Sequence, residues 1–253
     1  MNTSSNYHVP NLKRALLVLE LLGQNRGGMT LSEIVEALSV PKNSIFRITA
    51  TLLDSGYLLK NNDKKFVLTR KLLAIGSSAV SEYSLVEKSF DIMCQLRDLL
   101  QETVLIGTIA QNEFIVMEQA AGKHPFKFML DIGSRISLHT AAPAKSIMAY
   151  LPGKQLENLL NVMDFKQFNQ RTITTTAGFR AALEDVREHG YAIDRAEELD
   201  GVHCIGAPIF DRYGYPVASI WTTGPSERLP ESLFETLGQQ IKEHADKISQ
   251  RLI

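Results

Sequence analysis

The chain has 253 residues, of which 44% are hydrophobic and 22% are charged, a globular composition with enough length for two domains. It contains no apolar run long enough to span a membrane, and residues 1–10 lack the apolar core of a signal peptide. The two cysteines, Cys94 and Cys204, are too few and too far apart for a disulfide framework or a paired-cysteine zinc site. We therefore expect a cytoplasmic protein with no membrane partner.

The charge of the chain is unevenly distributed. The formal net charge is -1, but residues 1–80 contain 10 Lys and Arg against 5 Asp and Glu, a net charge of +5. Residues 81–253 contain 17 Lys and Arg against 23 Asp and Glu, a net charge of -6. A small basic segment joined to an acidic body indicates that the N-terminal part meets a polyanion, although charge alone is equally compatible with two solvated surfaces.

The first seventy residues predict a winged helix-turn-helix. Apolar residues recur at helical spacing over 12–22, and glycines follow. Thr30 with Glu33 three residues later forms a capping box that opens a short helix over 31–38. A three-residue turn leads to a helix over 42–54, which ends near Gly56. Strands over 57–60 and 65–69 then form a basic hairpin around 61–64.

The helix over 42–54 has one polar face. On a helical wheel its hydrogen-bonding side chains fall within an arc of about 100°, and Ile45, Phe46 and Ile48 lie opposite. In a helix-turn-helix the second helix enters the major groove, where Arg47 can pair with guanine and Asn43 with adenine. The alternative is a three-helix bundle with a solvated polar face, but the order of elements favours DNA. The candidate DNA contacts are Thr30, Lys42, Asn43, Ser44, Arg47, Thr51, Lys60, Lys64 and Lys65.

The rest of the chain predicts an α+β domain. Helices are expected over 70–81, 82–101, 141–151, 154–160, 176–189 and 229–252, and strands over 103–110, 113–119, 126–130, 191–194, 202–210 and 217–222. Their irregular alternation favours a mostly antiparallel sheet flanked by helices. We therefore expect a DNA-binding domain over 9–69, a linker helix over 70–81 and a second domain over 82–253.

Three C-terminal motifs carry a family resemblance. The first is Gly-Ser-Arg-Ile-Ser-Leu-His-Thr-Ala-Ala-Pro-Ala-Lys over 133–145. The second is Arg-Glu-His-Gly-Tyr-Ala-Ile-Asp over 187–194, continued over 197–211, and the third is Gly-Tyr-Pro-Val-Ala-Ser-Ile over 214–220. With the helix pattern before them, these segments resemble the IclR family of bacterial transcriptional regulators over about residues 12–252.

The resemblance implies a fold and a function. It implies a GAF-like α/β effector domain that binds a small organic acid, such as a sugar acid, keto acid or aromatic acid. It also implies a homodimer or homotetramer that binds operator DNA, more often a repressor than an activator, without a cofactor and without enzymatic activity. The effector pocket carried over by position comprises Leu130, His139, Ala142, Pro143, Asp194, Cys204, Trp221 and Thr223.

The residues of this pocket also have ordinary structural interpretations. Thr140 is a plausible N-cap for a helix whose first N–H groups could hold a carboxylate. Asp194 could accept a ligand hydroxyl or cap the following turn. His139 is more often a structural hydrogen-bonding group, and Cys204 an inert core residue. Trp221 stands where the family commonly has a small hydroxyl residue, so it would narrow the pocket or offer a stacking face.

Two alternative functions depend on the same residues. A cysteine-dependent enzyme would combine Asp194, His203 and Cys204, but neighbours on a strand point to opposite faces and could not share a proton. A metal-binding sensor would bring together His139, Asp194 and Cys204, although their spacing is not that of a metal-ligand motif.

Overall fold

The computed structural model describes residues 9–25, 27–72, 75 and 85–252. The chain forms two compact units, Met1–Glu82 and Tyr83–Ile253. Most of the helix expected over 70–81 lies outside the described residues. No helix in the described part of the chain combines the length and the apolar character that a membrane span requires.

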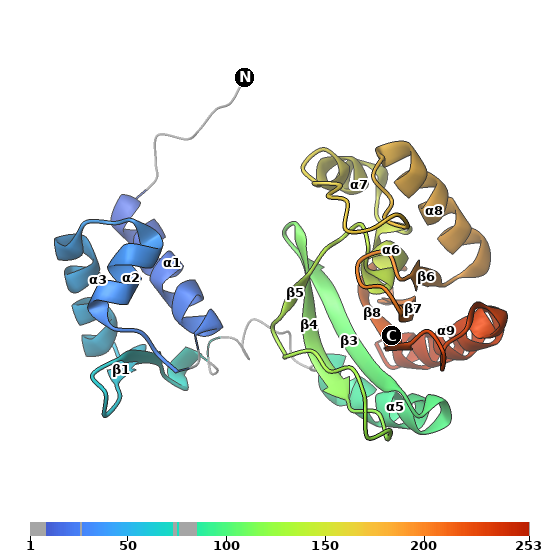
Figure 1. Ribbon diagram of the computed structural model, residues 1–253, viewed down its shortest axis with the longest axis horizontal. Coiled ribbons are helices and arrows are strands. Elements are labelled where there is room, and N and C mark those ends of the chain that lie inside the picture. The colour runs from blue at the N-terminus through green and yellow to red at the C-terminus, as the bar shows by residue number, and fades with distance from the viewer. Residues whose placement is uncertain (1–8, 26, 73–74, 76–84, 253) are drawn as a thin grey trace. The chain divides into compact units, whose positions relative to one another are not determined.

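The N-terminal unit has the expected three helices and hairpin (Figure 1). They are α1 (Pro10–Gln24), α2 (Leu31–Leu38), α3 (Lys42–Asp54), β1 (Leu58–Lys60) and β2 (Phe66–Leu68). The capping box is confirmed, because the Glu33 backbone N–H donates to Thr30 Oγ1 over 3.3 Å and the Thr30 N–H donates to Glu33 Oε2 over 2.7 Å. A small core holds the helices against the hairpin and comprises Val18, Leu22, Ile34, Ile45, Ile48, Leu58 and Phe66.

The C-terminal unit is built on one antiparallel sheet of six strands in the order β5-β4-β3-β8-β7-β6. The strands are β3 (Thr103–Ala110), β4 (Glu113–Ala120), β5 (Arg135–Ile136), β6 (Ala192–Arg195), β7 (Val202–Phe210) and β8 (Pro216–Pro225). The prediction of a mostly antiparallel sheet is therefore confirmed.

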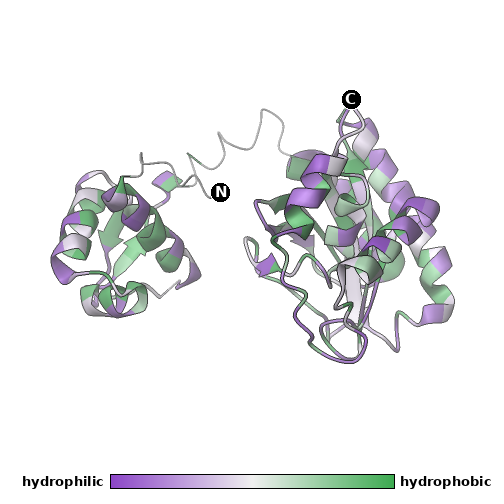
Figure 2. Ribbon diagram, turned by 90° about the horizontal axis from the view of Figure 1, so that it is seen from above, coloured by the Kyte–Doolittle hydropathy of each residue, from purple (hydrophilic) through white to green (hydrophobic). Residues whose placement is uncertain are grey.

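Helices cover both faces of this sheet. The helices α5 (Leu85–Leu100) and α9 (Phe234–Gln250) pack on one face through Ile92, Leu96 and Ile241. The other face is covered by α6 (Ala142–Met148), α7 (Gly153–Leu160) and α8 (Thr176–His189). The helices turn hydrophobic residues toward the sheet and hydrophilic residues outward (Figure 2). The sheet is thus buried on both sides, and residues alternate between two separate cores.

The strand expected over 126–130 is wrong. This segment has no regular structure, and Phe126 is 66% exposed. The edge partner of β4 is instead the two-residue strand β5, with Phe114 opposite Ile136. The apolar residues of 126–130 alternate as in a strand, but two of them contact each other, since Phe126 packs edge-to-face on Phe128 at 5.7 Å. The final helix also begins later than expected, after a 3-10 turn over Glu231–Leu233.

Candidate functional site

The outer face of α3 presents the side chains expected to meet DNA. Asn43 and Arg47 are exposed, while Ile45 and Ile48 are buried against the other helices. Thr49 closes the inner face, where its hydroxyl donates to the Ile45 carbonyl over 2.9 Å. The core thus fixes the rotation of α3 about its own axis, so Asn43 and Arg47 are held outward.

Ser44 has a different role from its neighbours. It is half-buried, and its hydroxyl accepts a hydrogen bond from Arg14 over 3.2 Å and donates to Asn11 Oδ1 over 3.4 Å. These contacts join the start of α3 to α1. Arg14 was not anticipated, because a cation in an amphipathic helix carries no sequence signal for a partner 30 residues away. A groove of about 400 Å³ runs along this junction and is lined by Asn11, Ala15, Asn43, Ser44, Arg47, Ile48, Thr51 and Leu52.

Phe46 does not lie on the inner face of α3, where the helical wheel put it. Its side chain is 61% exposed. At about 100° per residue, Phe46 is one step around the helix from Ile45, which places it at the border between the core and the outer face. The core closes over Ile45, Ile48 and Thr49 and leaves Phe46 outside.

The hairpin of β1 and β2, which forms the wing of the motif, is held in shape by the side chain of Asn61. Asn61 Oδ1 accepts hydrogen bonds from the backbone N–H groups of Asp63 and Lys65, each over 3.0 Å. Lys64 takes a left-handed conformation with φ 60°, and Lys60 Nζ lies 5.0 Å from the centre of the Phe66 ring. Lys60 and Lys64 are exposed and Lys65 is half-buried, so one hairpin gathers three cations. The Thr30 hydroxyl, in contrast, is engaged in the capping box, and the Thr51 hydroxyl donates to the Arg47 carbonyl.

In the C-terminal unit, three of the predicted pocket residues form a row across neighbouring strands. The register pairs Asp194 on β6 with Cys204 on β7, and Cys204 with Thr223 on β8. The Cys204 thiol donates to Thr223 Oγ1 over 3.3 Å. Asp194 Oδ1 accepts the backbone N–H of Glu197 over 2.7 Å, so this carboxyl caps the turn after β6. Burial raises the pKa of Asp194 to about 6, against the opposing effects of Lys145 and of the Glu197 N–H.

A buried ion pair next to this row was not identified from the sequence. Lys145 Nζ on α6 lies 2.5 Å from Glu197 Oε1, and the two side chains are 2% and 7% exposed. The Thr172 hydroxyl donates to the Glu197 carbonyl over 2.6 Å and holds this turn in place. Among the described residues, Glu197 Oε2 is the buried side-chain oxygen that has no hydrogen-bond partner. The site therefore contains a buried acceptor that a donor group can satisfy.

Close packing of α6 on the sheet forms the wall of the site. A Cβ added to Gly206 would lie 3.2 Å from the backbone of Pro143, which is tighter than an ordinary contact, so glycine at this strand position lets α6 approach the sheet closely. Trp221, paired with Gly206, is 1% exposed and packs edge-to-face on Phe114 at 5.3 Å. Ala142 and Pro143 are buried beside it. Trp221 is thus a core residue that borders the row.

Three further expectations have definite outcomes. Thr140 is not an N-cap, because α6 begins one residue later at Ala142 and the Thr140 hydroxyl donates instead to Glu198 Oε2 over 2.6 Å. His139 Nε2 lies 2.9 Å from the Lys166 carbonyl, and its ring stacks near Phe168, which is a structural role. Leu130 is half-buried against the core that contains Trp221.

The geometry argues against a thiol enzyme. His203 lies on the opposite face of β7 from Cys204, and its Nδ1 is 2.8 Å from the Leu229 carbonyl. Burial, reinforced by the neighbouring Asp194, raises the pKa of the Cys204 thiol far above its usual range. A nucleophilic cysteine needs a lowered pKa, usually through an imidazole within reach, whereas the pKa of Cys204 is raised and His203 lies on the other face of the strand.

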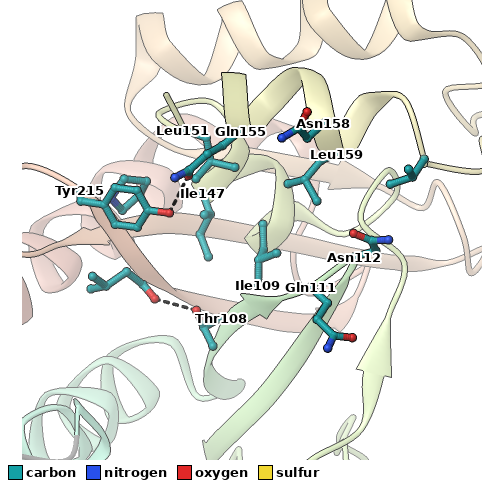
Figure 3. Close-up of a pocket in the computed structure, with 13 residues that line it drawn as sticks. Thr108, Ile109, Gln111, Asn112, Ile147, Leu151, Gln155, Asn158, Leu159 and Tyr215 are labelled. Carbon is teal, nitrogen blue, oxygen red and sulfur yellow. Dashed lines mark hydrogen bonds between the residues drawn. The ribbon is translucent and has the colours of Figure 1, made fainter. Parts of the chain in front are cut away.

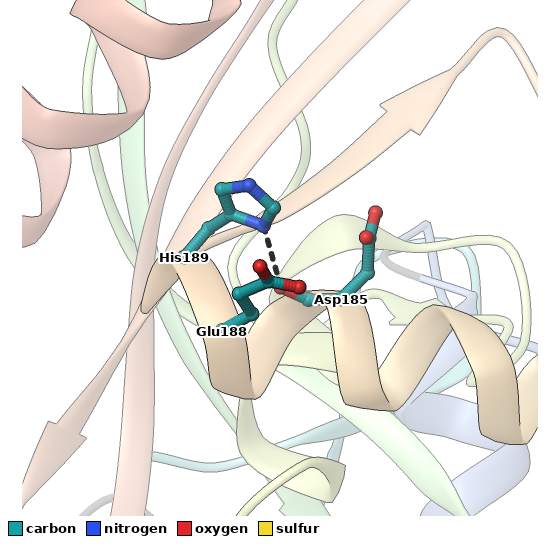
Figure 4. Close-up of side chains that lie close together, drawn as sticks. All are labelled: Asp185, Glu188 and His189. Carbon is teal, nitrogen blue, oxygen red and sulfur yellow. Dashed lines mark hydrogen bonds between the residues drawn. The ribbon is translucent and has the colours of Figure 1, made fainter.

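The three residues of the alternative metal sensor do not gather as one group, because Asp194 and Cys204 are neighbours on β6 and β7 while His139 lies at the Lys166 carbonyl. Within the described residues, the metal-ligating side chains that gather in a group of three are Asp185, Glu188 and His189 (Figure 4). All three are exposed on the last turns of α8, and His189 Nδ1 lies 2.8 Å from the Asp185 carbonyl. Side chains at i, i+3 and i+4 share one helix face in any helix, so this grouping does not by itself indicate a metal.

A separate groove lies at the other end of the strands that carry Cys204 and Thr223. Its volume is about 480 Å³, and α6, α7 and the β3–β4 hairpin surround it (Figure 3). Tyr215 donates to Gln155 Oε1 over 2.8 Å at its rim, and the Thr108 hydroxyl donates to the Val217 carbonyl over 2.7 Å. Its lining is uncharged and mixed, with polar side chains such as Gln111 and Asn158 beside apolar ones such as Ile147 and Leu159. It holds none of the predicted pocket residues.

Two family models match the chain. The model described as the C-terminal domain of the bacterial transcriptional regulator IclR matches residues 77–250, and that of the IclR helix-turn-helix domain matches residues 11–61. The chain belongs to the IclR family. This IclR-family protein is accordingly a DNA-binding transcriptional regulator and not an enzyme.

Individual relatives match over nearly their whole length. The transcriptional regulator KdgR of Escherichia coli is 26% identical over 245 residues, which cover 96% of this chain and 93% of KdgR. The crystal structure of Thermotoga maritima IclR has a TM-score of 0.74 and 29% identity, covering 97% of this chain and 99% of that one. An IclR homologue from Microbacterium hydrocarbonoxydans, solved with 4-hydroxybenzoate, shares the fold with a TM-score of 0.83 at 20% identity, covering 96% and 98% of the two chains.

Proposed function

We propose that this IclR-family regulator is a repressor that binds operator DNA as a homodimer or homotetramer and responds to a small organic acid. The DNA is read by α3, and the acid is held where α6 packs on the row of Asp194, Cys204 and Thr223. The observation that carries the effector assignment is the buried Lys145–Glu197 pair, whose second carboxylate oxygen has no partner among the described residues.

The DNA-binding half of the proposal depends on the outward face of α3. Asn43 and Arg47 are exposed in the first half of the second helix of the motif, which is the part that contacts base edges. The exposed wing lysines are suited to phosphate contacts, which position the protein without reading sequence. The domains proposed for these roles are residues 9–69 for DNA, 70–81 as the linker and 82–253 for the effector.

An exposed apolar stripe on α1 supports self-association. Val9, Leu12 and Leu16 are 61%, 59% and 52% exposed, and their spacing puts them on one side of the helix. Helix-turn-helix dimers place their two recognition helices on half-sites about 34 Å, or a multiple of that distance, apart, and a second copy covering this stripe would supply the second α3. The stripe lies outside the core of the unit, so it is available for this contact.

The chemistry of the effector site suits an acid that also carries a donor. The Lys145 ammonium has three N–H donors, and the hydrogen bond to Glu197 uses one of them. Glu197 Oε2 accepts from a donor, and a hydroxyl group supplies one. Burial raises the pKa of Asp194 to about 6, so this carboxyl takes up a proton more readily than an ordinary aspartate, which would lower its repulsion of a carboxylate bound beside it. The Microbacterium homologue, solved with an aromatic hydroxy acid, supports this class of ligand for the fold.

The proposed response is a shift between two populations. The effector favours whichever arrangement of the two units it binds better, and it shifts the balance only by that difference in affinity. The resemblance to the family favours repression, so the acid is expected to lower operator affinity.

A thermal-shift screen on the intact chain tests the effector assignment. Sugar acids, 2-keto acids and aromatic hydroxy acids are added one at a time, and a true effector raises the melting temperature by mass action. Thr223→Val and Asp194→Ala should remove that increase while the unliganded protein still melts cooperatively. An acid that stabilises both variants as much as the wild type would place the site elsewhere.

A further inference from the structure

Phe46 is an exposed aromatic side chain on the helix that reads DNA. It is 61% exposed, although it lies between Ile45, which is fully buried, and Arg47, which is exposed. Exposed apolar side chains are common on protein surfaces and need no explanation alone. Phe46 differs from such residues because it lies on the recognition helix, where an exposed side chain can contact DNA.

The outer face of α3 is continuous and mixed in chemistry. Asn43, Phe46, Arg47 and Ala50 are all exposed and are related by steps of three and four residues, so they form one surface strip. Ser44 and Thr51 lie toward the α1 groove, on the far side of the strip from Phe46. Phe46 thus forms one edge of the strip, beside the two side chains assigned to base edges, and lies in the first half of the helix.

The major groove offers one apolar group for such a ring. Each base pair shows hydrogen-bonding atoms there, but thymine also shows its C5 methyl group, and phenylalanine is among the side chains that contact it. We propose that Phe46 reads a thymine methyl group in the operator, beside the base pairs that face Asn43 and Arg47. This inference rests on the DNA-binding function and adds a specificity-determining residue to it.

The surroundings of Phe46 favour DNA over a protein partner. Lys42, one turn before Phe46, and Arg47 are also exposed, and the first eighty residues carry a net charge of +5, which is complementary to a polyanion. The apolar stripe of α1, formed by Val9, Leu12 and Leu16, belongs to another helix and does not include Phe46. The ring is therefore an apolar contact set within a cationic, hydrogen-bonding surface.

Deoxyuridine substitution tests the proposal, because it removes only the methyl group. Duplexes that bind the full-length chain are first selected from a random-sequence library, and each thymine of the selected duplex is then replaced in turn. Affinity is measured by fluorescence anisotropy at one salt concentration. We expect one position per half-site where the substitution lowers wild-type affinity about threefold to tenfold, the scale of one buried methyl group.

Two variants connect that effect to Phe46. Phe46→Ala should bind the thymine duplex about threefold to tenfold more weakly and should bind thymine and deoxyuridine duplexes equally at that position. Phe46→Leu should keep part of the discrimination. Lys64→Ala, a wing variant, should weaken both duplexes alike and keep the full methyl effect. Unchanged melting temperatures show that the exposed substitutions leave the fold intact.

The outcomes separate this inference from the function on which it rests. If the chain selects no duplex, the DNA-binding assignment itself fails. If it selects a duplex but Phe46→Ala retains a methyl effect at every thymine, or no thymine shows one, only the role of Phe46 is wrong. A change in sedimentation of Phe46→Ala without a change in methyl discrimination would likewise overturn the inference, because it would assign the ring to a contact between copies.

Discussion

Lys145 and Glu197 form an ion pair of 2.5 Å across 52 residues of sequence, in a part of the sheet domain almost sealed from water. Burying two charges costs several kcal/mol per ion, and their attraction offsets this only where geometry is good. Removing one partner leaves the other charge buried alone. The loss of either side chain is therefore expected to destabilise the folded protein, because the other charge stays buried without its partner.

Lys145→Met should destabilise the effector domain by about 3–5 kcal/mol, because Glu197 is then buried without its cation. The double variant Lys145→Met/Glu197→Met should recover most of this loss, since an apolar pair of similar volume needs no compensation. Urea unfolding measures both. The control is Arg180→Ala, which breaks an exposed pair with Glu157 and should cost under about 1 kcal/mol. A Lys145→Met protein as stable as the wild type would show that the pair is not buried.

Asp194 should make stability depend on pH in a definite direction. Its pKa is raised from 3.8 to about 6, so the folded protein holds the proton more tightly than the unfolded chain does. The resulting stabilisation is complete below about pH 4 and is lost as the pH rises through 6, a change of roughly 3 kcal/mol. Asp194→Asn keeps an acceptor for the Glu197 N–H but cannot ionise.

The measurement for this prediction is the difference in unfolding free energy between wild type and Asp194→Asn from pH 4 to 8. The wild type should lose stability relative to the variant as the pH rises through 6. A difference that stays constant over this range would mean that Asp194 keeps an ordinary carboxyl pKa and is hydrated in the folded protein.

Arg47→Ala should remove sequence-specific DNA binding while effector binding persists. Loss of a bidentate contact to a base costs about 1–3 kcal/mol, equivalent to about fivefold to 150-fold in affinity, and relaxes specificity at that position. Anisotropy with selected and scrambled duplexes measures this. The effector-induced thermal shift should be unchanged, because Arg47 belongs to the other compact unit. Equal binding of the selected duplex by variant and wild type would remove Arg47 from the reading face.

The wing lysines should contribute charge but no sequence information. Lys64→Ala should weaken binding to all duplexes alike and reduce the slope of log affinity against log salt by about 1, as expected for one phosphate contact. Lys154→Ala, an exposed lysine of the effector domain, is the matched control and should leave the slope unchanged. A sequence-selective loss in Lys64→Ala would instead indicate that the wing reads base edges.

Local patterns predicted most of the fold. The capping box of Thr30, the three-residue turn before α3 and the paired runs around Asn61 each depend on residues a few positions apart, and all three were confirmed. Phe46 shows the limit of the helical wheel, because a residue at the border of two faces is placed by the neighbouring helices and not by its own hydrophobicity. The strand prediction over 126–130 was wrong for a related reason: strand pairing depends on distant residues, and β4 pairs at its edge with Arg135–Ile136.

The candidate effector site was less accessible to sequence reasoning. Asp194, Cys204 and Thr223 were carried over from a resemblance, and the strand register now puts them side by side. Lys145 and Glu197 were not paired, because a contact over 52 residues leaves no local trace and charged residues are normally exposed. The available signal in the sequence was the position of Lys145, a single charged residue within an otherwise uncharged and mostly apolar helix.

If one chain couples an acid site to a DNA site, the binding of the two ligands must be thermodynamically linked. The operator affinity of the intact protein is measured with and without an acid that raises its melting temperature, and the affinity for that acid is measured with and without operator. We expect both affinities to fall by the same factor. An acid that stabilises the protein but leaves operator affinity unchanged at saturation would contradict it.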